Sequence, residues 1–238
     1  TLLASAIASV LALSACTDNK PAAEQQTPAP AVAATQGADA TMANPLLTVS
    51  PLQYQAPQFD LIKVEHYLPA MEAGIIENAA EIETIANNTE AATFDNTIVA
   101  LEKSGALLDR ATSVFFNMTG TISNPEILKI QATMAPKLAA HGDNISLNPK
   151  LFARVKAIYD TRKELKLDSE ALRLVEVTYE RFVRAGALLN DEQKTTIRAL
   201  NEEHSKLANQ FGQNLLKITK DIAIVVEDKA QLAGMSDA

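Results

Sequence analysis

The fold is decided by the stretch VEHYLPAMEAGIIENAAEIETIA, residues 64–86. Its apolar residues recur at steps of three and four, which places them on one face of a helix: Val64, Leu68, Met71, Ile75, Ala79, Ile82 and Ala86. Pro69 falls near the first turn, where proline is tolerated, and Asn87-Asn88 ends the pattern. The stretch therefore predicts a helix that buries one apolar face.

Helical signals continue along the rest of the chain. Asn124-Pro125 and Asn148-Pro149 each place a capping side chain before a proline at the first helical position, and Asp168 and Asn190 are further caps. We expect helices at about 94–118, from 125 to near Gly142, from 149 onward, at 169–186 and at 191–222. The run Ile222–Val226 is the only segment that resembles a strand. The predicted fold is all-α, with about six helices packed antiparallel.

The last of these helices carries a single apolar stripe, made of Ile197, Leu200, His204, Leu207, Phe211, Leu215, Ile218 and Ile222. Such a stripe packs against other helices. The family resemblance described below further implies that the stripes also face a second lobe, so this chain is expected to expose apolar surface, notably near Ile222–Val226.

The N-terminal residues predict export. Leu2–Ala15 is apolar and uncharged, too short to span a bilayer, and typical of the apolar region of a secretory signal. It ends in Leu13-Ser14-Ala15-Cys16, which resembles the bacterial lipobox, in which the cysteine is lipidated. The alternative is a buried N-terminal helix with an incidental cysteine. We predict a signal segment over residues 1–15, with a truncated start, and lipidation at Cys16.

Residues 16–45 form a predicted disordered tether, since they are rich in Ala, Pro, Gln and Thr and cannot bury enough apolar surface to order themselves. Residues 46–238 suffice for one domain. Thr17 follows the lipidated position, which by resemblance to enterobacterial sorting favours the outer membrane. The expected location is the periplasmic side of a bacterial envelope, with the membrane reached through the lipid anchor.

Composition excludes several classes of function. The formal net charge is −8 and the pI is near 5.0, so a basic stripe for nucleic acid is missing and we expect no nucleic-acid partner. Trp is absent and Tyr and Phe are sparse, which argues against stacking on bases or sugars. Cys16 is the only cysteine, so no intrachain disulfide can form.

Candidate catalytic residues have simpler structural interpretations. His66 lies at a helix start, where capping is favoured, and His141 lies near a predicted helix end, where a positive charge complements the dipole. His204 lies on the last apolar stripe, which favours a hydrogen-bonded core or flank position. Three carboxylates resemble a solvated face: Glu77, Glu81 and Glu83. The N-x-S/T triplets at Asn87, Asn117 and Asn144 are interpreted as chance matches.

Motifs for known chemistries are missing from the sequence. A zinc peptidase of the zincin type needs two histidines one helical turn apart in H-E-x-x-H, and no such frame occurs. Glu-x-x-His pairs for a di-iron site, G-x-S-x-G, a Walker loop and C-x-x-C-H are also absent. We assign no catalytic, cofactor-binding or metal-binding residue to this sequence.

Several strings nevertheless resemble one family. Asn44-Pro45-Leu46-Leu47, Glu65-His66-Tyr67-x-Pro69-Ala70 and Phe182-Val183-Arg184-Ala185-Gly186 are among them. Further matches are Thr93-Phe94-x-Asn96-Thr97, Ala100-Leu101-Glu102-x-Ser104-Gly105, Val114–Asn117, Ala135–Leu138 and Leu151-Phe152-x-Arg154-Val155. In order, they resemble the opening of the thimet-oligopeptidase-like zinc metallopeptidases, most closely the bacterial peptidyl-dipeptidase (dipeptidyl carboxypeptidase) branch.

The resemblance implies an all-α, antiparallel lobe of a two-lobed metallopeptidase. In that family the zinc ligands and the general-base glutamate lie in a part that follows these residues. The lobes enclose a narrow channel that admits short peptides and excludes folded proteins. The implied partners are thus short peptides and the chain's own catalytic lobe, and the implied cofactor is zinc bound by that lobe.

The chain begins at Thr1 and stops at Ala238, and we interpret it as a fragment that is inactive alone. Two other interpretations stay open: a self-sufficient helical lipoprotein acting as a binding or scaffold module, and a degenerate gene product. An H-E-x-x-H motif several hundred residues downstream would decide for the peptidase.

Overall fold

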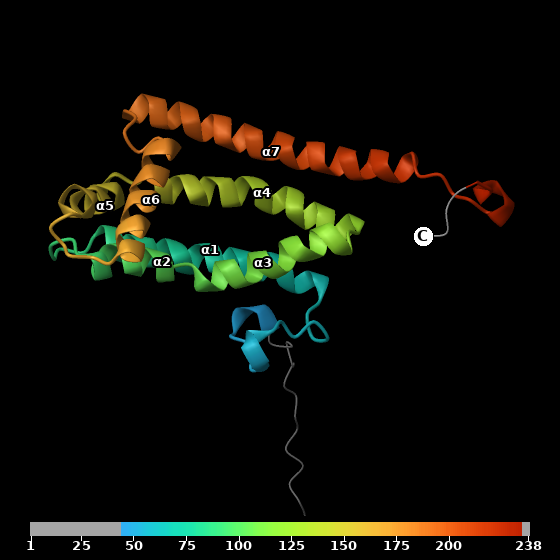
Figure 1. The fold of residues 1–238 in the computed structure, drawn as a ribbon, viewed down its shortest axis with the longest axis horizontal. Coiled ribbons are helices and arrows are strands. Elements are labelled where there is room, and N and C mark those ends of the chain that lie inside the picture. The colour runs from blue at the N-terminus through green and yellow to red at the C-terminus, as the bar shows by residue number, and fades with distance from the viewer. Residues whose placement is uncertain (1–43, 235–238) are drawn as a thin grey trace, which may run out of the picture. The chain divides into compact units, whose positions relative to one another are not determined.

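The structure is a computed structural model that describes residues 44–234, all within one compact unit (Figure 1). These residues form helices and no strand, which confirms the all-α prediction. The helices are η1 (Pro45–Leu47), η2 (Gln53–Gln55), α1 (Val64–Ala86), η3 (Phe94–Val99), α2 (Ala100–Lys103), α3 (Ala106–Thr121), α4 (Pro125–Ser146), α5 (Pro149–Thr161), α6 (Ser169–Ala185), α7 (Asp191–Asp221) and η4 (Lys229–Leu232). The predicted signal segment, Cys16 and most of the predicted tether lie outside the described residues. Asn44 and Pro45, at the end of that tether, are the cap and first residue of η1.

Helix α1 is the centre of the helical packing, because it contacts α3, α4 and α5. Its predicted apolar face buries Met71 against Phe115 of α3 and Met134 of α4, and Tyr67 meets the Phe115 ring edge-on at 5.3 Å between centroids. α3 runs antiparallel to α1, since Tyr67 meets Phe115 whereas Glu81, later in α1, meets Gly105, just before α3. α4 runs parallel to α1, as the Glu72–Lys137 and Asn78–His141 pairs show. The predicted antiparallel packing therefore holds for some neighbours of α1 but not for α4.

A second apolar core lies at the C-terminal end of α1. Ile82 and Ile85 pack there against α5 and α6. Phe152 of α5 stacks on Phe182 of α6, with the ring centroids 6.1 Å apart. Stacked aromatic pairs stabilise such contacts by about 0.5–1.5 kcal/mol beyond their burial. α1 thus spans two cores and joins them.

The predicted helix starts are confirmed by their caps. The side chains of Asn124, Asn148, Asp168 and Asn190 each accept a hydrogen bond from a backbone N–H in the first turn of the following helix. Such a bond satisfies an N–H group that the helix itself leaves free, which is worth about 1 kcal/mol. α6 ends at Gly186, whose φ of 104° is the left-handed conformation of a helix stop.

Three sequence-based expectations need correction. The helix expected at 94–118 is divided: η3 is a π-helix, and the chain breaks at Ser104-Gly105, where φ of Gly105 is 79°, before α3 begins. α4 passes Gly142 and ends at Ser146, because a single glycine inside a helix costs only about 1 kcal/mol relative to alanine and does not by itself end the helix. Ile222–Val226 is no strand but the exposed, irregular segment after α7, since no neighbouring strand pairs with it in the described region.

Among residues 44–234, every helix is too short or too polar to cross a lipid bilayer.

Candidate functional site

The contact between α4 and α7 is made by polar side chains. Asn201 Nδ2 donates to Asp143 Oδ1 at 2.7 Å, and Arg198 donates through a guanidinium nitrogen to Asn144 Oδ1 at 2.9 Å. Further along, Gln213 Nε2 donates to the backbone oxygen of Leu128 at 3.3 Å. Residue numbers rise along α7 as they fall along α4, so the two helices are antiparallel, as Figure 1 shows. The α7 side that faces its own lobe is therefore hydrophilic.

Most large apolar residues of α7 lie on an exposed row, whereas Ile197, predicted to share that row, is partly buried. We define the α7 stripe as Leu200, Leu207, Phe211, Leu215, Ile218 and Ile222, each more than half exposed. A helix turns about 100° per residue, so the stripe lies roughly a third of a turn from the side that carries Asn201 and Arg198. No residue of α7 is buried. His204 shares the stripe and is exposed, so its expected core or flank position is wrong.

The C-terminal part of α7 extends beyond the helix that supports it. Gln213 already contacts Leu128, in the first turn of α4, and residues 214–221 continue for about two further turns. Figure 1 shows this end of α7 projecting past α4. Leu215 and Ile218 lie on this overhang, and Ile224 and Val225 follow it, 90% and 78% exposed. The side of the overhang that carries Leu215 and Ile218 is therefore apolar and uncovered.

Two open grooves lie beside α1, on either side of one buried hydrogen bond. A groove of about 580 Å³ is lined by α3 and its neighbours: Asn78, Gly105, Leu108, Asp109, Phe116 and Leu138 are among its residues. A second, of about 470 Å³, is lined by residues of α1 and α4 that include Ile75, Ile76, Lys137 and His141. Between them His141 Nε2 lies 2.7 Å from Asn78 Oδ1. Both grooves are open to the surface, and the second contains the Lys137–Glu72 ion pair beside His141.

The His141–Asn78 pair continues into a chain of polar contacts. Glu81 accepts from Asn78 Nδ2 at 3.4 Å and from the backbone N–H of Gly105 at 2.7 Å. Glu81 thus holds the break before α3 and does not belong to the solvated face expected for it, whereas Glu77 and Glu83 are exposed as predicted. His141 is buried inside α4, and burial lowers its pKa. The expected charge–dipole role of His141 at a helix end is therefore wrong.

His66 performs the predicted capping role. Its Nδ1 accepts a hydrogen bond from the backbone N–H of Lys63 at 3.1 Å, at the residue that precedes α1. Asn44 Nδ2 donates to the backbone oxygen of His66 at 2.8 Å, so the first described residue is tied to the same turn. Nδ1 of His66 is therefore engaged in this cap.

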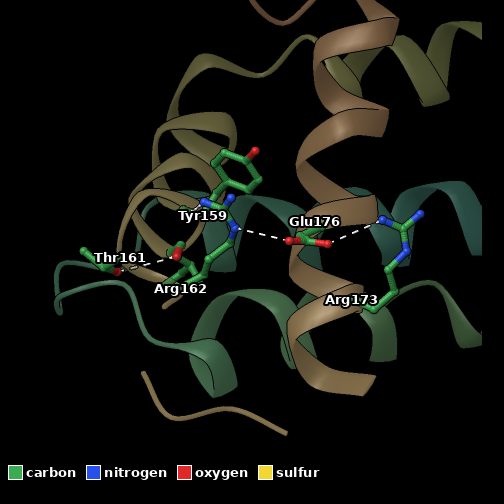
Figure 2. A network of polar contacts seen from close by, with 6 residues as sticks. Tyr159, Thr161, Arg162, Arg173 and Glu176 are labelled. Atoms are coloured by element: carbon green, nitrogen blue, oxygen red, sulfur yellow. Dashed lines mark hydrogen bonds and ion pairs between the residues drawn. The ribbon is translucent and has the colours of Figure 1, made fainter. Parts of the chain in front are cut away.

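A polar clasp joins α5 and α6, as Figure 2 shows. Glu176 of α6 receives Arg162 on one carboxylate oxygen and Arg173 on the other, at 3.5 Å each. The Arg162 guanidinium lies 3.8 Å from the centroid of the Tyr159 ring, and that ring stacks on Tyr179 at 3.8 Å. The cation–π contact lies within the end of α5, whereas the Tyr159–Tyr179 stack and the Arg162–Glu176 pair join α5 to α6. Glu176 is already paired twice and is a structural carboxylate.

The described residues do not fit a zinc site. No three of their His, Cys, Asp or Glu side chains gather at one point between residues 44 and 234. A catalytic zinc needs three protein ligands around an open position. His66 is a cap, His141 is paired with Asn78, and His204 stands on the surface of α7. We therefore derive no chemical step from a metal held by this part of the chain.

Comparison with known proteins identifies relatives. No protein-family model matches the chain. It is 48% identical over 193 residues to the dipeptidyl carboxypeptidase of Salmonella typhimurium, covering 81% of this chain and 28% of the relative. Over 197 residues it is 48% identical to the dipeptidyl carboxypeptidase of Escherichia coli, covering 83% and 29%. An organellar oligopeptidase A of Arabidopsis thaliana is 25% identical over 195 residues, covering 81% and 24%.

The relatives that this chain matches are named as peptidases, which gives the class of protein. These identities are more specific: the chain belongs to the thimet-oligopeptidase-like peptidase family, in which it resembles dipeptidyl carboxypeptidases more than oligopeptidases A. It spans less than a third of the length of these curated relatives.

The sequence identified most members of the α7 stripe, but it did not indicate which side of α7 faces α4. The missing signal was on the other side of the same helix, where Arg198, Asn201, Ser205 and Asn209 recur at helical spacing. That polar row is the one that contacts α4. Neither the Glu81–Gly105 contact nor the burial of His141 has a local sequence signal, because both depend on helices that meet from far apart in the chain.

Proposed function

We propose that this chain is the N-terminal helical lobe of a zinc-dependent peptidyl-dipeptidase that hydrolyses short oligopeptides and releases C-terminal dipeptides. The observation that supports the proposal is the 48% identity to two dipeptidyl carboxypeptidases, against 23–25% to oligopeptidases A over a similar span. The identity to dipeptidyl carboxypeptidases is about twice that to oligopeptidases A, and on this basis we propose the release of C-terminal dipeptides for this protein.

In this proposal the lobe forms a wall of the substrate channel and contributes no catalytic group. Zinc and the residues that activate water belong to polypeptide outside residues 44–234. The open groove lined by α1 and α3 suits a wall, because it offers shape and apolar contact on the surface of the lobe. A narrow channel selects substrates by size, so short unfolded peptides enter and folded proteins do not.

We further propose that the protein is held on the periplasmic side of a bacterial envelope, at the outer membrane, through lipid on Cys16. Support comes from the lipobox-like Leu13-Ser14-Ala15-Cys16 and the polar residues that follow it. Several acyl chains on one cysteine would give durable anchoring, whereas a single chain binds only marginally. Short peptides in the periplasm would then be the substrates.

A chimeric enzyme tests the proposed function. The matched 197-residue region of the Escherichia coli dipeptidyl carboxypeptidase would be replaced by its counterpart from this chain. Hydrolysis of an N-blocked tetrapeptide and release of its C-terminal dipeptide would be followed by chromatography, with the same region deleted as the control. We expect kcat/KM within about tenfold of the parent enzyme, a cost of at most about 1.4 kcal/mol in the transition state. A folded, zinc-loaded chimera without hydrolysis would contradict the proposal and favour a separate binding module.

A further inference from the structure

We infer that the α7 stripe, together with Ile224 and Val225, is the docking surface for the remainder of the peptidase. The occupant is polypeptide equivalent to the part of the dipeptidyl carboxypeptidases that lies outside the region matched by this chain. This inference rests on the proposed function, which it deepens by naming the surface through which the lobe joins its partner.

The first step is the reversed orientation of α7. An amphipathic helix normally buries its apolar face against its own domain and exposes its polar face. Here Asn201 and Arg198 are turned to α4, and Phe211 on the stripe is 70% exposed. Burial of a large apolar side chain contributes about 1.5–3 kcal/mol, and the lobe gains none of this from the stripe. Burial of the stripe therefore contributes to stability only if another surface covers it.

The second step is the continuity of the uncovered surface. The stripe begins with Leu200, follows α7 onto the overhang beyond α4, and passes into Ile224 and Val225. Scattered apolar residues are ordinary on a protein surface, whereas a continuous row of this length marks an interaction site. A helix that projects past its support also gains no stability from its own lobe over those turns.

The third step decides the occupant. The matched region makes up 28–29% of the two dipeptidyl carboxypeptidases, so most of each relative lies outside it and must contact this lobe if the enzyme is to act as one body. A second copy of this chain is the less favourable occupant, because two chains of formal net charge −8 would repel each other. The surface therefore fits an intramolecular partner.

Thiol labelling in the chimera tests this assignment. Phe211→Cys places a thiol on the stripe, and Ile76→Cys, at a residue 71% exposed on α1, is the matched control. Both would be made in a Cys16→Ala background, which removes the only native thiol of this chain. Labelling by a maleimide would be followed at each residue by mass spectrometry, first in the isolated chain and then in the chimera.

We expect equal labelling rates at the two positions in the isolated chain, measured at a dilution at which it is monomeric. In the chimera, labelling at Phe211→Cys should slow about tenfold or more, since thiol reactivity follows exposure, while Ile76→Cys keeps its rate. Equal rates at both positions in the chimera would overturn the inference. This readout does not depend on hydrolysis, so a chimera that is inactive but protects position 211 would contradict the proposed function alone.

A second pair of variants excludes an artefact of the introduced thiol. Phe211→Ser with Leu215→Ser should leave the melting temperature of the isolated chain unchanged, because both side chains are exposed there, and lower that of the chimera by about 3 °C or more. Ile76→Ser should change neither. If the double variant disrupts self-association of the isolated chain but leaves the chimera unaltered, a second copy is the occupant and the inference is wrong.

Discussion

His141 shows how one side chain can join distant parts of this chain. It hydrogen-bonds Asn78, which contacts Glu81, and Glu81 holds the backbone of Gly105. Through these contacts α4, α1 and the break before α3 share one polar chain. Burial lowers the pKa of His141, because the imidazolium is less well solvated there than in water. The folded chain therefore keeps this histidine neutral at a pH where the unfolded chain already binds a proton.

The consequence is a loss of stability in acid. An exposed histidine has a pKa of about 6.5, so between that value and the lower pKa of the folded state only the unfolded chain is protonated. The contribution of His141 is complete above about pH 6.5 and declines as the pH falls. We expect the melting temperature of the wild-type chain to fall more steeply from pH 7.5 to 5.5 than that of His141→Gln. Parallel profiles would show that His141 does not titrate as described.

Cys16 carries the second prediction at this scale. Cys16→Ala should abolish lipidation and move the protein from the membrane fraction to the soluble fraction, since lipid on Cys16 is the proposed anchor. Fractionation and immunoblotting of cells that express both forms would measure it, with Ser14→Thr, which keeps the cysteine, as the control. A Cys16→Ala protein that still sediments with membranes would place the anchor elsewhere.

At the scale of elements, local signals predicted most of the helices and tertiary contacts set the rest. The caps at Asn124, Asn148 and Asp168 act within one turn, so their sequence patterns were sufficient. The break at Gly105 depends on Glu81, 24 residues away, and could not be predicted locally. The direction of the α7 stripe could not be predicted locally either. Hydrogen-bond acceptors on α4, such as Asp143 Oδ1, determine which side of α7 faces that helix.

Gly74 tests the close packing of α1 against α3. A Cβ at this position would lie 2.7 Å from Cα and 2.8 Å from the backbone nitrogen of Leu108, so helix backbones would have to separate. We expect Gly74→Ala to destabilise the chain by about 1–3 kcal/mol in denaturant unfolding. Gly142→Ala in α4 is the matched control: its Cβ meets nothing, and it should stabilise by about 0.5–1 kcal/mol. Equal effects of the two variants would mean that α1 and α3 are farther apart.

At the scale of the whole molecule, the lobe has two buried apolar cores joined by α1, but it also leaves a row of large apolar side chains exposed on α7. Both cores have fully buried members, such as Met71 in one and Val155 in the other. The α7 stripe belongs to neither of them. The fold class was predictable from periodicity, whereas the side of α7 that stays exposed was not, because it depends on hydrogen-bond partners on α4. No catalytic residue was assigned from the sequence, and no three His, Cys, Asp or Glu side chains gather at one point in residues 44–234.

The uncovered stripe predicts the behaviour of the isolated chain. We expect a helical circular dichroism spectrum together with concentration-dependent self-association in sedimentation, since contiguous exposed apolar surface promotes association. Phe211→Ser with Leu215→Ser should reduce that association and leave the spectrum unchanged, and Ile76→Ser should not reduce it. An isolated wild-type chain that stays monomeric at high concentration and melts cooperatively would favour a self-sufficient binding module.

The most direct test of the central claim is the nucleotide sequence of the gene beyond the codon for Ala238. The proposed peptidyl-dipeptidase needs an open reading frame that continues for several hundred residues and encodes H-E-x-x-H, the motif that supplies zinc ligands and the general base. We predict that the motif is present in frame. A gene that ends close to this codon, or a long continuation without the motif, would contradict the claim that this lobe is part of a zinc peptidase.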